Sequence, residues 1–253
     1  MKKTLLCHFY NEEYMLPWFL NHHKQIFDHG VMIDYHSTDR SREIIKEICP
    51  TWEIRTTKND FFDSALIDRE VETIEKEISG WRICLNVTEF LYGNYSHLAN
   101  ISKDTWYFIG SYVFVDMLDN QPIDNNQPLH TQRTWGYKDL SNGRTLSEGD
   151  RPRRSLHNYL ISYPVHGGRH YDEPASFDDL YIFYYGYAVL NENGIKRKTQ
   201  IQGKMSSTEQ KKLVASHPNK VTEKSFLDKI AKHIRPKAKD ITNEIQPIIK
   251  FNY

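Results

Sequence analysis

The sequence predicts an α/β fold in which a mostly parallel central sheet is flanked by helices. Apolar runs of strand length alternate with helical apolar spacing over residues 3–90, and polar clusters directly follow these runs. The chain has 253 residues, of which 39% are hydrophobic and 13% aromatic, so it can bury one sizeable core. Strands that alternate with helices of this length form parallel sheets with right-handed crossovers, covered on both faces.

The first strand is expected at residues 3–10, which form an apolar run. Apolar residues then recur at near-helical spacing across residues 15–27. Pro17 fits the first turn of a helix but not its interior, so this helix is expected to begin near Leu16.

Two further strand and helix pairs follow, and then a fourth strand. The second strand is expected at residues 30–35, with a helix after the capping side chains of residues 37–39. A third strand at residues 52–56 precedes a long helix that Gly80 ends. The apolar face of this helix consists of Ile67, Val71, Ile74 and Ile78. The fourth strand starts at Trp81, where apolar and polar residues alternate as far as Thr88.

The overall charge and composition exclude several classes of protein. Lys and Arg number 33, as do Asp and Glu, so no net field attracts the chain to nucleic acid. The sequence contains no signal peptide pattern and no apolar run of the ~20 residues that span a bilayer, and a cytoplasmic protein is expected. Cys7, Cys49 and Cys84 lack the spacing of a zinc site and are expected to be reduced packing residues.

Three polar clusters are expected at one edge of the sheet. They are residues 11–13 after the first strand, residues 34–39 after the second and residues 86–89 at the end of the fourth. Ligands of open α/β sheets bind beyond the carboxyl ends of the strands. These separate segments therefore predict a single ligand site.

The same segments resemble family-2 glycosyltransferases with the GT-A fold. They read FYNEE at residues 9–13, DYHSTDRS at residues 34–41 and WRICLNVTEF at residues 81–90. In that family the first segment reads tyrosine, asparagine, glutamate, the second aspartate, glycine, serine, threonine, aspartate, and the third is an apolar strand ending in aspartate-x-aspartate. The resemblance covers residues 3–92 and implies a Rossmann-like sheet with a mixed, acceptor-side portion after it. A weaker match links residues 184–187 and 191–202 to a late motif and a lysine-bearing helix of some members.

This resemblance implies transfer of a sugar from a nucleotide-diphosphate-sugar, with a UDP-sugar favoured, to a carbohydrate or glycan acceptor, with inversion. The donor-binding residues that it implies are Tyr10, Asn11, Glu12, Asp34, Asp39, Asp63, Asn86, Thr88 and Lys198. Tyr10 would flank the base, and Asp34 would accept a hydrogen bond from a pyrimidine or a ribose. Structural roles stay open, since Asn11 and Asp63 also fit helix caps and Asp34 fits a strand-end turn.

Two departures from the family affect the chemistry. His36 replaces a glycine, which crowds the turn after the second strand. Asn86 and Thr88 replace the two aspartates, so both side chains are expected on one strand face without the charge that a divalent cation prefers. Glu89 is the acidic residue left there, and it is the candidate ligand for Mn²⁺ or Mg²⁺.

Three interpretations of this departure stay open. Glu89 forms a weak metal site, basic side chains stabilise the leaving diphosphate without metal, or the chain is a catalytically inactive nucleotide or carbohydrate binder. The candidate basic residues are Arg133, Arg169, Lys196, Arg197, Lys198 and Lys204. Nucleotidyl transfer on a similar fold is disfavoured, because it needs strong carboxylate ligands.

An inverting transfer also needs a general base, which is an aspartate downstream of the acidic motif in relatives. Asp178 and Asp179 are the favoured candidates, with Asp172 and Glu173 in the same stretch. A solvated loop carboxylate is the alternative for each of them.

The chain divides into three expected parts. Residues 1–92 form the nucleotide-sugar-binding half, residues 93–220 the aromatic-rich acceptor-binding half of the same domain, and residues 221–253 a helical tail. Sugars stack their apolar faces on aromatic rings, which fits an acceptor cleft in the second part. The tail is expected to dock on the domain, with subunit pairing or peripheral membrane contact as alternatives.

Overall fold

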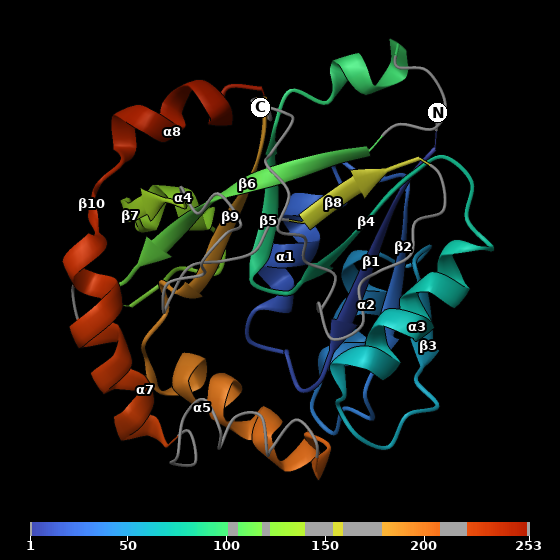
Figure 1. Cartoon of the computed structure of the whole chain (residues 1–253), viewed down its shortest axis with the longest axis horizontal. Coiled ribbons are helices and arrows are strands. Elements are labelled where there is room, and N and C mark those ends of the chain that lie inside the picture. Colours follow the sequence, from blue (N-terminus) through green and yellow to red (C-terminus); the bar gives the residue numbers. More distant parts are fainter. Residues whose placement is uncertain are drawn as a thin grey trace.

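The molecule is built on one extended sheet with helices on both sides (Figure 1). The computed structural model describes residues 2–100, 106–117, 122–139, 154–158, 179–207 and 222–251. Its strands are β1 (Lys3–Phe9), β2 (His29–Asp34), β3 (Glu53–Thr56), β4 (Trp81–Asn86), β5 (Glu89–Gly93), β6 (Trp106–Val115), β7 (Trp135–Lys138), β8 (Arg154–His157), β9 (Leu180–Tyr187) and β10 (Lys239–Asp240). Its α-helices are α1 (Leu16–His23), α2 (Ser41–Ile48), α3 (Ser64–Glu75), α4 (Leu129–Gln132), α5 (Glu192–Gln200), α7 (Glu223–Lys229) and α8 (Thr242–Ile249).

The N-terminal half of the sheet is parallel, as the alternation of strands and helices predicts. Its strand order is β3-β2-β1-β4, and β1 pairs in parallel with both β2 and β4. His8 lies opposite Ile33 on one side and Asn86 on the other, so the carboxyl ends of β1, β2 and β4 share one edge. The strand order and the crossover helices are compatible with a GT-A-like fold.

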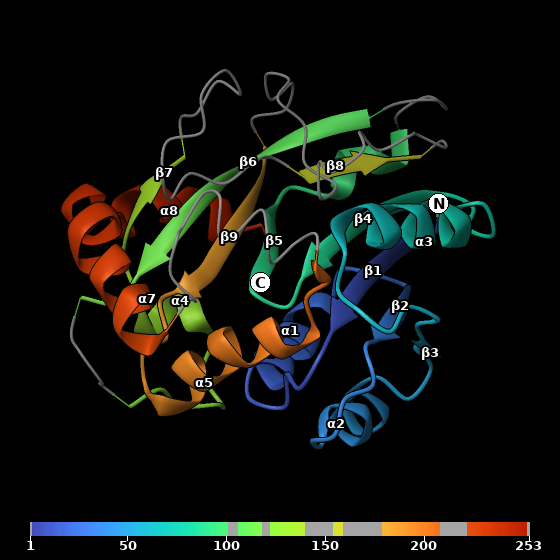
Figure 2. The same ribbon diagram turned by 60° about the horizontal axis from the view of Figure 1, so that its bottom comes forward.

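The two faces of β1 are covered by different helices. Leu5, Cys7 and Phe9 belong to the core that α1 and α2 cover, whereas Leu6 packs with Ile67 and Val71 of α3. Figure 2 shows α3 on one side of these strands and α2 on the other. Alternation along the strand therefore places His8 and Asn86 on the α3 side.

Two element boundaries differ from the sequence prediction. α3 ends at Glu75 rather than at Gly80, and Gly80 lies in the following connection with a φ of 88°. A Cβ at Gly80 would lie 2.2 Å from the Lys2 carbonyl oxygen, so glycine is required there. β4 ends at Asn86, and Val87 and Thr88 form a turn into β5, so Thr88 is not a strand residue as expected.

The C-terminal half of the sheet is mixed. β8 joins β4 to β6 through antiparallel pairs, and β9 pairs in parallel with β6 and antiparallel with β5. β7 and β10 extend the sheet beyond β6. The antiparallel strands place Arg154 of β8 and Tyr184 of β9 near the end of β4.

The tail docks on the domain, which confirms the default expectation. Phe226, Ile230 and Ile234 pack into a core with Val113 of β6 and Tyr184 of β9. Further along, β10 pairs with β7, and the apolar face of α8 joins the main core. The tail therefore covers the outer half of the sheet.

The expectation for the cysteines is confirmed. Cys7, Cys49 and Cys84 are buried free thiols. In the part of the chain that the structure describes, no helix is long and apolar enough to cross a bilayer.

His36 adopts a backbone conformation that favours glycine. Its φ is 60°, in the left-handed region where a side chain costs roughly 1–2 kcal/mol. We expect His36→Gly to raise the free energy of unfolding by up to about 1 kcal/mol, measured by chemical denaturation, because relief of this strain exceeds the added entropy of the unfolded chain. His36→Ala is the matched control, and an equal gain in that variant would contradict the explanation.

Candidate functional site

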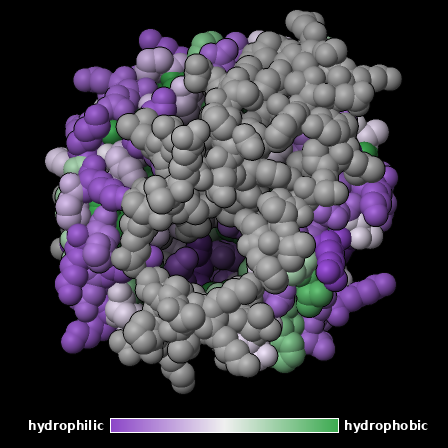
Figure 3. Space-filling view, viewed as in Figure 1, coloured by the Kyte–Doolittle hydropathy of each residue, from purple (hydrophilic) through white to green (hydrophobic). Residues whose placement is uncertain are grey.

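A pocket of about 300 Å³ lies where the carboxyl ends of β1 and β4 meet α3 and α5. The lining residues are His8, Phe9, Tyr10, Glu12, Phe62, Ser64, Ile67, Asn86, Val87, Thr88, Arg154, Tyr184, Arg197, Lys198, Ile201 and Met205. This is the sheet edge at which the polar clusters of the sequence predict a ligand. Figure 3 shows that the molecule is hollowed on one face and that the visible floor of the hollow is hydrophilic.

Arg154 and Glu89 form a buried ion pair beside this pocket. Arg154 Nε donates to Glu89 Oε2 at 2.9 Å and Nη2 donates to Oε1 at 3.1 Å, while both side chains are at most 3% exposed. The Asn86 backbone N–H also donates to Glu89 Oε2, at 2.7 Å. A two-point pair of this kind fixes the guanidinium plane, so Glu89 positions Arg154 at the pocket wall.

Arg197 and Glu12 form a second pair, which connects α5 to the loop after β1. Arg197 Nε lies 2.9 Å from Glu12 Oε2, and both side chains are about 85% buried. Burial raises the pKa of the Glu12 carboxyl to about 7, although the charges of Arg197 and Lys198 oppose the shift. Glu12 therefore changes its charge near neutral pH.

Contacts with the N-terminal half hold α5 and the chain after it in place. Gln200 Nε2 donates to the Asn11 carbonyl oxygen at 2.7 Å, and Ser206 Oγ donates to Asp63 Oδ2 at 2.8 Å. Lys204 Nζ lies 5.2 Å from the centre of the Tyr10 ring, within range of a cation–π contact. These contacts place Arg197, Lys198 and Lys204 at or beside the pocket.

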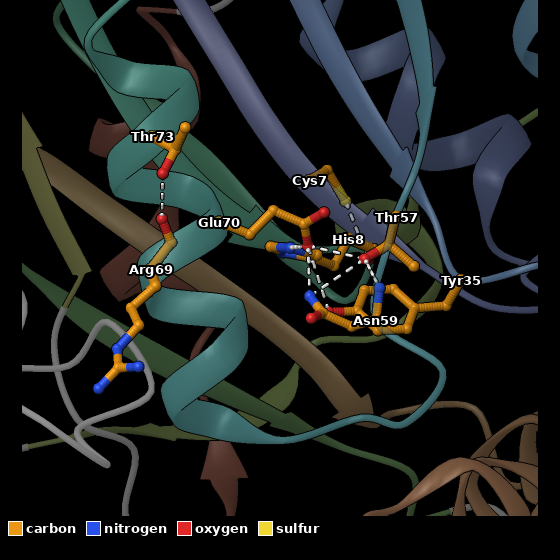
Figure 4. Close-up of polar contacts among 8 residues, drawn as sticks. All are labelled: Cys7, His8, Tyr35, Thr57, Asn59, Arg69, Glu70 and Thr73. Carbon is orange, nitrogen blue, oxygen red and sulfur yellow. Dashed lines mark hydrogen bonds and ion pairs between the residues drawn. The ribbon is translucent and has the colours of Figure 1, made fainter.

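A polar network supports the wall of the pocket that His8 forms (Figure 4). Glu70 Oε2 of α3 accepts from Tyr35 Oη at 3.3 Å and from Thr57 Oγ1 at 3.0 Å, and His8 Nε2 lies 3.4 Å away. Burial alone would raise the pKa of Glu70, but the hydrogen bonds from His8, Thr57 and Tyr35 hold it below the usual value. Glu70, which does not itself line the pocket, thus holds the His8 ring in place.

The loops after β1 and β2 are interlocked by reciprocal hydrogen bonds. Asn11 Oδ1 accepts from the Thr38 backbone at 2.7 Å, while the Asn11 backbone donates to Ser37 Oγ at 3.0 Å. Asp39 Oδ2 accepts from the Glu13 backbone at 3.0 Å. These side chains hold the rim of the site together, and Asn11 adopts a φ of 50° to do so.

The comparisons with known proteins give remote similarities. No family model matches the sequence, and no curated protein matches it. The crystal structure of S. aureus TarS 1-349 is similar at 10% identity over 92% of this chain and 75% of that chain, with a TM-score of 0.39. Its complex with UDP-GlcNAc is similar at 10% identity over 93% and 74% of the two chains, with a TM-score of 0.37. HddC from Yersinia pseudotuberculosis is similar at 10% identity over 73% and 90%, with a TM-score of 0.33. Similarity this remote assigns neither a family nor an activity to the chain.

The structure brings together one group of the residues that the sequence singles out. Those that line the pocket are Tyr10, Glu12, Asn86, Thr88 and Lys198. The end of β4 presents Asn86 and the turn after it presents Thr88, so the two residues do not share one strand face as expected.

The other expected donor-binding residues do not line the pocket, and their side chains have partners within the protein. Asn11 and Asp39 interlock the loops. The Asp34 carboxylate accepts from the Ser37 backbone at 2.9 Å and pairs with Arg42 Nη1 at 2.7 Å. Asp63 caps α3 through the Ala65 and Leu66 backbones, which is the alternative role that the sequence left open.

The candidate general bases and two of the candidate basic residues are not found in the described lining of the pocket. Asp178 and Arg169 lie outside the described residues. Asp179 is exposed, and its carbonyl oxygen accepts from Asn94 beyond the far end of β5, about 13 Å along the strand from Glu89. The structure therefore does not bring Asp179 to the pocket. Arg133 does not line the pocket either, and its Nε donates to the Ala188 carbonyl oxygen at 3.0 Å.

The residues present do not fit a divalent metal at the position that the resemblance implies. Asn86 and Thr88 offer neutral oxygens, and both carboxylate oxygens of Glu89 already accept hydrogen bonds from Arg154. A hard cation prefers several charged oxygen ligands, so it would compete with a buried arginine here. Among the described residues no group of three or more His, Cys, Asp or Glu side chains is arranged to hold a metal ion.

Sequence reasoning missed Arg154 and His8 as pocket residues. Arg154 follows Arg151 and Arg153 in a basic stretch, which by itself is typical of a solvated surface. His8 lies inside an apolar strand, where a packing role is the ordinary interpretation. Only the strand pairing of β8 with β4 and of β1 with β4 places the two residues beside Asn86.

Proposed function

We propose that this chain is a family-2-like glycosyltransferase that moves a sugar from a nucleotide-diphosphate-sugar, with a UDP-sugar favoured, to a glycan acceptor. The observation that supports it is the pocket at the strand carboxyl ends, which combines the Tyr10 ring with the cations Arg154, Arg197 and Lys198. Rings bind a base, and guanidinium or ammonium groups bind phosphate oxygens.

The proposal extends to the leaving group. As the bond to the sugar breaks, negative charge grows on the diphosphate, and cations fixed in a partly buried pocket stabilise it. Arg154 is held rigidly by Glu89, and Arg197 and Lys198 are presented by the anchored helix α5. These basic residues take the role that a metal has on an aspartate-x-aspartate motif, so we expect no metal requirement.

Binding of nucleotide-sugars is the direct test. Uridine, guanosine and thymidine diphosphate sugars would be screened by thermal shift and by slow donor hydrolysis, with Mn²⁺, with Mg²⁺ and with chelator. We expect one donor to bind and to be hydrolysed slowly. Its thermal shift and its rate of hydrolysis should be the same with metal and with chelator. Failure of every nucleotide to bind would overturn the proposal, and a strict metal requirement would overturn its second part.

Lys198 and Lys196 provide a matched pair of variants on one helix. Lys198 lines the pocket, whereas Lys196 is exposed outside it. We expect Lys198→Met to weaken donor binding about tenfold, because one charge-assisted contact to phosphate contributes about 1.5 kcal/mol or more. Lys196→Met should change it less than twofold, and equal effects would contradict the assigned pocket.

The alternative function is a nucleotide or carbohydrate binder without catalysis. Its support is that neutral Asn86 and Thr88 stand where the family has aspartates. Donor binding with no hydrolysis and no transfer, in metal or in chelator, would establish it.

A further inference from the structure

A second cavity, of about 280 Å³, lies between α1, β5 and the chain before α4. It shares no described lining residue with the first pocket. Thr88 lines the first pocket, and Phe90 and Tyr92 of β5 line the second. The two cavities therefore have separate described linings and can bind separate ligands.

The described lining of this cavity consists mainly of amide side chains and rings, together with Pro128 and Leu129, and it contains no charged side chain. The amides are Asn21, Gln25, Asn125, Asn126 and Gln127, and all of them are exposed at the rim. The rings are Trp18, His22, Phe90 and Tyr92. Planar amides both donate and accept hydrogen bonds, as sugar hydroxyls require, and rings pack against the apolar C–H face of a sugar.

One wall of the cavity is held by side-chain hydrogen bonds to two backbone carbonyl oxygens. Trp18 Nε1 donates to the Gln127 carbonyl oxygen at 3.0 Å and lies 3.3 Å from that of Asp124. Gln132 Nε2 donates to the same two carbonyl oxygens at 2.9 Å. Because these bonds hold the Asp124 and Gln127 carbonyl groups in place, the exposed amide side chains beside them are presented on a preorganised support.

His22 adds an acceptor to the cavity. Its Nε2 lies 2.7 Å from the Leu91 carbonyl oxygen, which can only accept, so Nε2 carries the proton. Burial lowers the pKa of His22 to about 4, and the ring is therefore neutral at physiological pH. The other nitrogen, Nδ1, is then an acceptor with no hydrogen-bond partner among the residues that the structure describes.

We propose that this second cavity binds one neutral sugar residue of a glycan. Its volume is at the small end for ligand sites, which suits a single ring better than an extended chain. The lack of charge in the described lining favours neutral sugars over uronic acids or amino sugars. The proposal stands independently of the function of the first pocket, and in a glycosyltransferase the site would retain a glycan beside the catalytic cleft.

The test uses the full chain and the indole N–H resonance of Trp18, assigned in a ¹⁵N-labelled protein with the Trp18→Phe variant. Methyl glucosides, methyl galactosides and N-acetylglucosamine would be titrated to 50 mM, with glucuronate as the charged comparison. We expect at least one neutral sugar to shift the Trp18 resonance with a Kd in the ~mM range, as for small neutral ligands, and glucuronate to leave it unmoved.

Exposed amides provide variants that preserve the fold. Asn21→Ala and Asn125→Ala should each weaken the titrated sugar about fivefold, the loss expected for one hydrogen bond, and Asn193→Ala on α5 is the matched control. Absence of any shift with every neutral sugar would overturn the proposal. Equal affinity in all three variants would also overturn it, as would complete displacement of the sugar by saturating UDP, which would assign the sugar to the first pocket.

Discussion

Glu89→Gln is expected to lower the free energy of unfolding by about 3–5 kcal/mol, because it leaves the buried Arg154 guanidinium without its counter-charge. Chemical denaturation at neutral pH measures the loss. The ion pair is almost fully buried and bidentate, so water cannot replace the carboxylate that the variant lacks. This makes Glu89 a structural partner of Arg154 rather than a spare acidic group.

The double variant Glu89→Leu/Arg154→Met is the control. Replacing both members of a buried pair with apolar residues of similar volume is commonly neutral, so most of the lost stability should return. Nucleotide-sugar binding should not return, because Arg154 is then absent from the pocket. The reverse pattern, a stable Glu89→Gln protein that loses a response to Mn²⁺, would identify Glu89 as a metal ligand and contradict the structural role.

Glu12→Gln is expected to remove the pH dependence of donor binding. With a pKa of about 7, Glu12 is neutral below pH 7 and negative above it, next to Arg197, Lys198 and Asp39. Rising pH therefore places a negative charge near the bound diphosphate and should weaken binding about tenfold between pH 6 and pH 8. The Gln variant should bind UDP-glucose equally at both values and about tenfold more tightly than the parent at pH 8.

UDP-glucose is the proper probe for this measurement by calorimetry, because its diphosphate is doubly substituted and does not titrate in that range. The same raised pKa has a consequence for folding. The contribution of Glu12 to stability is fully present below its unfolded pKa of about 4.5 and is lost as the pH rises through 7. A donor affinity that is flat from pH 6 to pH 8 in the parent protein would contradict the assignment.

The N-terminal half of the fold could be predicted because its signals are local. Each strand and helix of residues 3–86 has its own apolar period, and α3 is readable from Ile67, Val71 and Ile74 alone. The end of α3 was placed too late because Ile78 continues the apolar spacing after the helix has ended. For the C-terminal half of the sheet, the sequence predicted a mixed portion but not its strands or their pairing. Pairs such as β6 with β9 join segments that lie far apart in the chain.

The candidate pocket lies at the sheet edge where the sequence places polar clusters, and only some of the expected donor residues line it. Residue type alone cannot separate a ligand contact from a contact between loops. Asn11 and Asp39 illustrate this, because both accept backbone hydrogen bonds from the neighbouring loop. Arg154 could not be found, because its position depends on the antiparallel pairing of β8.

The interlocked loops have a consequence for what the residue types at this sheet edge indicate. A side chain that links two loops by hydrogen bonds stabilises the fold whether or not a substrate is bound. Asn11, Ser37 and Asp39 are of this kind, whereas no hydrogen bond within the described part of the chain ties the side chain of Asn86 or Thr88 to another loop. The residue types of the first two segments are therefore constrained by the scaffold, and those at Asn86 and Thr88 are open to change with the ligand.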